Sequence, residues 1–265
     1  MPRCTGADRL APQHFVHMPI PSVTNHLAAE VERLSGRPVI VQEDRSLPVF
    51  ANMVTARGSA PAHVVRYRPG PGMPTDYFIA FQLTLVVRLF SCPPDERWQV
   101  AADEMELRRA RADFGLDGLS PMLAGFLMDS LITQVRTTGV GMRVDRWLRA
   151  EFPELQAQQE QAARMQLAEN EQSLAPEVRR RFPPPLVDAN TGMNAAFARF
   201  WSLKLGEKRF EMPYGALGYD QTAQALLATL TEVSHAPGSD RQLIEAWARI
   251  VGLTGYFHFE PHVLL

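Results

Sequence analysis

The segment TDYFIAFQLTLVVRLF, residues 75–90, decides the fold class of this chain. It is apolar on nearly every side, and Gln82, Thr84 and Arg88 are the residues that interrupt it. The rigid turn GPGMPTD precedes it, where Thr75 or Asp76 can cap a helix. A helix that is hydrophobic all round is normally buried. The sequence therefore predicts a buried helix over these residues.

One helix and three short strands are predicted before this segment. Residues 22–36 place apolar side chains at helical spacing and end in a glycine. Three β-branched or apolar stretches, 38–42, 50–56 and 62–69, are bounded by Pro, Gly, Asp or Ser. The order helix, strands, helix predicts a small α+β layer.

The rest of the chain is helical by period. The fold class expected is therefore α+β, mainly helical, with the helix–strands–helix layer followed by a helical C-terminal part. Residues 154–172 are polar with sparse apolar positions, which favours an exposed helix or a linking arm. The last ten residues, YFHFEPHVLL, indicate a strand or an extended tail. Helices are expected over 95–113, 120–137, 140–151, 154–172, 187–204, 220–234 and 239–252.

These patterns divide the chain into three regions. Residues 1–20 are rich in Pro and His without a period and predict an irregular N-terminal arm. Residues 21–155 form the α+β domain, and residues 156–265 form the helical C-terminal region.

Residues 76–88, DYFIAFQLTLVVR, resemble the active-site segment of zincin-like metallopeptidases of the ImmA/IrrE type. That segment typically reads D-Y-x-I-A-H-E-x-G-H-x-x-R. Its two metal-binding His positions correspond here to Phe81 and Leu85, and its Glu position corresponds to Gln82. The later segment GVGMRVDRWLRAEFPEL resembles the family's third-ligand helix, with Asp145 where a Glu is expected. The resemblance implies a zincin-like fold over the first half of the chain.

The substitutions remove the chemistry of such a site. Phe and Leu have no lone pair for a zinc ion, and Gln82 cannot act as a general base. We expect Phe81 and Leu85 to fill the former metal cavity as core residues, and we expect no cofactor. The resemblance thus predicts a pseudoenzyme that acts by protein–protein interaction, as a subunit of a bacterial regulatory or defence assembly.

A protein partner is expected at one of two places. A peptidase-type fold implies a groove beside an edge strand, here 50–56 or 62–69, with Gln82, Arg88 and Asp145 as its polar groups. Arg66 and Arg68 would point outward from that sheet. The polar helix 154–172 is the second candidate surface. A homo-oligomer is left open.

The alternative is an active metal-dependent hydrolase with other ligands. His258, Glu260 and His262 alternate in the C-terminal segment, so an extended chain would place them on one face. One carboxylate and two imidazoles can bind a metal ion. Asp145 is a further ligand for this alternative.

Composition excludes several classes of protein. The net charge of -2 gives no general attraction to nucleic acid. No run of 18 or more apolar residues exists and no signal peptide is seen, so a cytoplasmic protein without a membrane span is expected. Cys4 and Cys92 are the two cysteines, too few for a disulfide framework.

Overall fold

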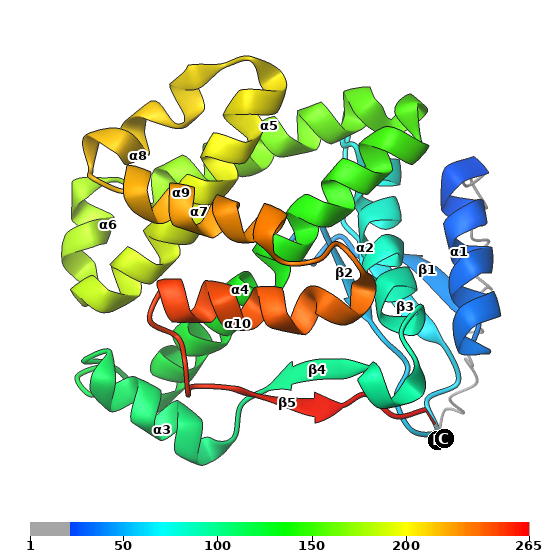
Figure 1. Cartoon of the computed structure of the whole chain (residues 1–265), viewed down its shortest axis with the longest axis horizontal. Coiled ribbons are helices and arrows are strands. Elements are labelled where there is room, and N and C mark those ends of the chain that lie inside the picture. Colours follow the sequence, from blue (N-terminus) through cyan, green and yellow to red (C-terminus); the bar gives the residue numbers. More distant parts are fainter. Residues whose placement is uncertain (1–21, 265) are drawn as a thin grey trace, which may run out of the picture.

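The computed structural model describes residues 22–264, so the predicted arm at residues 1–20 and Cys4 lie outside the described part. The fold is α+β and mainly helical, as predicted (Figure 1). Short 3-10 turns join several of the elements. In chain order the elements are α1 (Ser22–Ser35), β1 (Val39–Glu43), β2 (Ala51–Val54), β3 (His63–Tyr67), α2 (Thr75–Phe90), β4 (Trp98–Ala101), α3 (Glu104–Asp113), α4 (Pro121–Glu151), α5 (Gln156–Gln172), α6 (Pro176–Arg181), α7 (Pro184–Leu205), α8 (Met212–Ala216), α9 (Asp220–Glu232), α10 (Asp240–Ile250) and β5 (His258–Pro261).

The predicted helix–strands–helix layer is confirmed. Its sheet has the order β1-β3-β2. β1 runs parallel to β3, with Val39 opposite His63, and β2 runs antiparallel to β3, with Ala51 opposite Tyr67. Of the two segments predicted as the edge strand, 50–56 contains β2, which lies at an edge of the sheet, and 62–69 contains β3, which lies in its centre. Helices α1 and α2 pack against each other beside this sheet.

Helix α4 is one continuous helix, whereas two helices over 120–137 and 140–151 were expected. The glycines of the TTGVG stretch do not break it, because they make room for side chains of other helices. A Cβ added at Gly139 would lie 2.9 Å from Cε2 of Trp247, and one at Gly141 would lie 2.9 Å from Cζ of Phe81. Close packing therefore accounts for both glycines.

The helix expected over 95–113 is wrong in its first part. Residues 98–101 form β4, which pairs antiparallel with β5 near the end of the chain, so that Trp98 lies opposite Pro261. This pairing joins residues far apart in sequence, which a local pattern does not reveal. α3 begins only after Asp103, whose side chain forms a capping box with Glu106. The expected extended tail is confirmed as β5.

The hydrophobic core consists of two clusters that meet along α4 and α5. One cluster joins α1, β3 and α2 to the second half of α4, including Val144 and Leu148. The other joins α4, from Ala124 to Met142, to α7, α9 and α10, and it includes Trp201. The boundary expected at residue 155 stays a prediction, since α4 contributes to both clusters.

Helix α5 is less exposed than expected. Gln159, Ala162, Ala163 and Leu167 are buried on one of its faces, where it contacts α2 and α7. Two alanines, one amide and a single leucine form this buried face, so the hydrophobic period was too weak to show it. No described helix is long and apolar enough to cross a membrane.

Candidate functional site

The positions that resemble a metallopeptidase site meet between α2 and α4. Tyr77, Phe81 and Leu85 follow one another at intervals of four on α2, and Gly141 and Asp145 do so on α4. The ring of Phe81 lies directly against Gly141, since a Cβ added to this glycine would lie 2.9 Å from Cζ of the ring. Phe81 and Leu85 are half-buried and pack against the core clusters. Both therefore contribute to the core as expected, although part of each side chain stays exposed.

Asp145 is a buried structural carboxylate. The hydroxyl of Tyr77 donates to its Oδ1 at 2.5 Å, and Nε2 of Gln159 donates to the same oxygen at 3.1 Å. Burial raises the pKa of Asp145 to about 6, although both hydrogen bonds oppose that rise. Burial also raises the pKa of Tyr77 well above its usual value. Asp145 therefore cannot line an open groove, contrary to the expectation.

Tyr77 and Gln159 are the residues of this network that sequence reasoning missed. Tyr77 lies one helical turn before Phe81 on the same apolar face, which was a usable signal. Gln159 lies in a helix whose polar sequence indicated exposure, so no local signal pointed to its burial.

Gln82 covers part of the open edge of the sheet. Its Nε2 donates to the carbonyl oxygen of Ala51 on β2 at 3.3 Å. The backbone N–H of Arg68 donates to the carbonyl of Phe50, so by alternation the polar groups of Ala51 and Met53 point away from β3. The amide of Gln82 thus occupies one hydrogen-bonding position of the edge strand.

Arg88 is engaged in an ion pair. Its Nε and one terminal nitrogen donate to the two carboxylate oxygens of Asp240, each at 2.7 Å. Arg143 on α4 donates to the same carboxylate at 3.0 Å. Arg88 therefore joins α2 to α10 and is not a groove residue, contrary to the expectation.

The two other arginines proposed for interaction differ from each other. Arg66 is exposed on the central strand β3, opposite Asn52 of the edge strand. Arg68 is half-buried, because its guanidinium lies 5.1 Å from the centre of the Phe50 ring. Arg66 alone keeps the outward position that was expected.

The three ligands of the hydrolase alternative, His258, Glu260 and His262, are each bonded to groups of the protein. His262 is buried, and its Nε2 lies 3.0 Å from the carbonyl oxygen of Ala56. Glu260 accepts a hydrogen bond from Gln99. His258 faces Glu106, with Nδ1 and Oε2 2.8 Å apart. Oε1 of Gln99 also lies 3.3 Å from Nδ1 of His262, so Glu260 and His262 share a contact on β4, whereas His258 faces α3. Among the described residues, the three side chains do not form one group of possible metal ligands.

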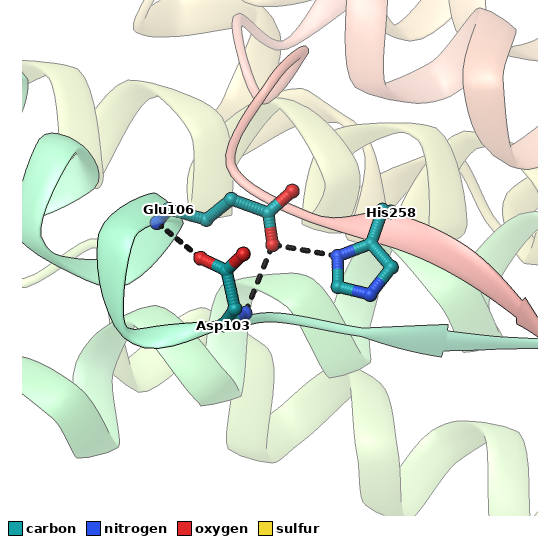
Figure 2. Close-up of side chains that lie close together, drawn as sticks. All are labelled: Asp103, Glu106 and His258. Atoms are coloured by element: carbon teal, nitrogen blue, oxygen red, sulfur yellow. Dashed lines mark hydrogen bonds and ion pairs between the residues drawn. The ribbon is translucent and has the colours of Figure 1, made fainter.

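His258 instead lies beside Asp103 and Glu106 (Figure 2). The three could offer ligand atoms within 4.8 Å of one another. The two carboxylates are already acceptors in the capping box of α3, with Asp103 and Glu106 each bonded to the other's backbone N–H. The hydrogen bond with Glu106 raises the pKa of His258. The contact between the imidazole of His258 and the carboxylate of Glu106, which joins β5 to α3, explains this group without a metal ion.

Cys92 does not have the surroundings of a reactive thiol. It is free and buried, and burial raises its pKa. A nucleophilic cysteine needs a lowered pKa.

Comparison of the chain with protein-family models, with curated proteins and with solved structures finds no match. The likeness to zincin-like peptidases therefore rests on residues 76–88, on Asp145 and on the order of the first elements, and it stays a hypothesis.

Proposed function

We propose that this chain is a non-catalytic, metallopeptidase-like protein that acts by binding another protein. One observation supports the proposal most directly. The positions corresponding to metal ligands and base are occupied by side chains with structural contacts: Phe81 packs on Gly141, Gln82 bonds to the edge strand, and Asp145 bonds to Tyr77. A carboxylate already bonded and buried is poorly placed to coordinate a metal ion.

The open edge of β2 is the surface we propose for the partner. The backbone groups of Met53 point to that side, and an extended chain can pair with such an edge. Arg66 is the cross-strand neighbour of Asn52 on the exposed side of the sheet. A partner strand there would displace Gln82 from the carbonyl of Ala51.

Metal content tests the loss of catalysis. Purified protein should contain far less than one equivalent of zinc by elemental analysis, and a chelator should leave its melting temperature unchanged. A content near one zinc per chain, lost together with several degrees of melting temperature on chelation, would overturn the proposal.

Partner binding is tested with two matched arginine variants. Arg66→Glu should abolish recovery of the partner from a lysate of the source cells. Arg45→Glu, an equally exposed change in the loop after β1, should leave recovery intact. Equal recovery with both variants would show that the partner does not bind at this sheet.

A further inference from the structure

An apolar stripe lies exposed along the first half of α4. Met122 is 84% exposed, Phe126 66% and Leu123 37%. They lie within about one turn of each other, whereas the large apolar side chains of the helix's second half are mostly buried. A cluster of exposed large apolar side chains is typical of an interaction surface.

A hollow of about 190 Å³ opens beside this stripe, between α4, α6 and α7. Its walls are mainly apolar and include Leu131, Val178, Phe182 and Leu186. A cavity of about 150 Å³ can hold a benzene ring, so a phenyl side chain is small enough to enter.

We propose that a second copy of this chain binds here, with Phe126 of each subunit in the hollow of the other. In a two-fold symmetric dimer the same patch serves both subunits, so a protruding group and a matching hollow must lie on one surface. Phe126 and Ser130, a residue that lines the hollow, are four positions apart on the same face of α4, about 6 Å along its axis. A two-fold rotation about an axis that is perpendicular to α4 and passes midway between these two positions exchanges the side chain and the hollow. This rotation places the two α4 helices antiparallel.

The charges beside the stripe are complementary under this rotation. Arg181 is the chain neighbour of Phe182, which lines the hollow, and its guanidinium lies 5.8 Å from the centre of the Phe182 ring. Asp129 follows Phe126 by three positions on α4. Both are exposed, and neither forms an ion pair with another residue of the described range 22–264. When Phe126 enters the hollow beside Phe182, the Asp129 that accompanies it approaches Arg181 of the partner subunit.

The size of the surface indicates a weak dimer. Residues 121–134 span about 21 Å of helix, which gives an interface at the lower end of the range for specific complexes. We therefore expect a reversible dimer with a dissociation constant in the micromolar range. This inference does not rest on the proposed function, because a catalytic chain could form the same dimer.

Sedimentation velocity of the full chain between about 1 and 200 µM tests the dimer, since a micromolar complex dissociates in that range. The wild-type protein should shift from monomer to dimer with concentration. Phe126→Glu should remain monomeric throughout. Leu203→Glu, which changes an apolar residue 73% exposed near the far end of α7, should dimerise like the wild type. Unchanged circular dichroism and melting would show that each variant is folded.

A charge exchange then tests the orientation of the two subunits. Asp129→Arg and Arg181→Asp should each weaken dimerisation at least about threefold, as loss of a rim ion pair does, and the double variant should recover most of that loss. A wild type that stays monomeric would overturn the proposal. So would a dimer that survives Phe126→Glu, or a charge exchange that restores nothing. If the wild type instead stays monomeric and co-sediments with vesicles of phosphatidylserine and phosphatidylcholine, the stripe binds lipid, and the proposal is again wrong.

Discussion

At the scale of single residues, Gly141 and Phe81 are complementary. Phe81 occupies a position that resembles a metal ligand's, and Gly141 provides the space for its ring. The apolar character of residue 81 could be read from the sequence. The need for a glycine opposite it could not, because that need arises from the approach of two helices.

Gly141→Ala should destabilise the protein. The new methyl group would lie 2.9 Å from Cζ of Phe81, and overpacking of this kind costs about 1–3 kcal/mol, offset by up to about 1 kcal/mol of helix propensity. Urea unfolding measures the change. Gly125→Ala is the matched control in the same helix, because a Cβ at Gly125 meets nothing within 4 Å. This variant should be more stable than the wild type by roughly 0.5–1 kcal/mol.

A second substitution tests the cause of that loss. Phe81→Leu should cost less stability in the Gly141→Ala background than in the wild type, because the smaller side chain relieves the clash. If Gly141→Ala is as stable as Gly125→Ala, the close contact between α2 and α4 is absent.

At the scale of elements, ion pairs join helices that the sequence suggested were in separate regions. Asp240 at the start of α10 accepts from Arg88 of α2 and from Arg143 of α4. The side chain of Arg143 is only 1% exposed, and burial lowers its pKa. Such a buried guanidinium depends on its partner, since an uncompensated buried charge is costly.

Asp240→Asn should therefore destabilise the protein by about 3 kcal/mol, measured by denaturant unfolding. The control is Glu245→Gln on the same helix. Glu245 pairs with Arg241, and both side chains are more than 40% exposed, so its loss should change stability by less than about 0.5 kcal/mol. Equal effects of the two substitutions would mean that Arg143 reaches solvent.

The helices and strands could be predicted where the hydrophobic period and the flanking turn residues of the segment itself determine them. α2, the three strands of the first sheet and the terminal strand follow from period and punctuation. Residues 98–101 were expected to be helical because their partner strand lies at the other end of the chain. The site network was predicted only in part, since Asp145 and Gln82 were identified but the partners that fix them, Gln159 and Ala51, lie on other elements.

At the scale of the whole molecule, the C-terminal segment returns to the loop that follows β2. His262 contacts the carbonyl of Ala56, and Leu264 forms a bridge with Gly58. His63 lies on the other side of Ala56, where its Nδ1 accepts from the Ala56 N–H at 3.0 Å. The rings of both histidines meet Phe90 edge-on. Two buried imidazoles therefore help to hold the terminal segment in place.

These groups predict how stability depends on pH. Burial, and then the charges of His262 and Arg37, lower the pKa of His63 to about 4. Its contribution is complete above pH 6.5 and is lost as the pH falls toward 4, because the unfolded chain takes up the proton first. Asp145 acts in the opposite direction. Its pKa of about 6 in the folded protein means that its contribution is complete at low pH and is lost as the pH rises through 6.

Asp145→Asn separates the two effects. In the wild type, protonation of Asp145 adds to the free energy of unfolding as the pH falls, and the variant lacks this contribution. Between pH 7 and pH 4.5 the free energy of unfolding of the variant should therefore fall by about 1–3 kcal/mol more than that of the wild type. Urea unfolding at several pH values measures this difference, and Glu169→Gln, an exposed change on α5, should follow the wild type. If the Asp145→Asn and wild-type curves run parallel, Asp145 is ionised throughout this range, and its carboxylate must reach water or a cation between α2 and α4. That outcome would also weaken the proposal that the position resembling a metal site is closed.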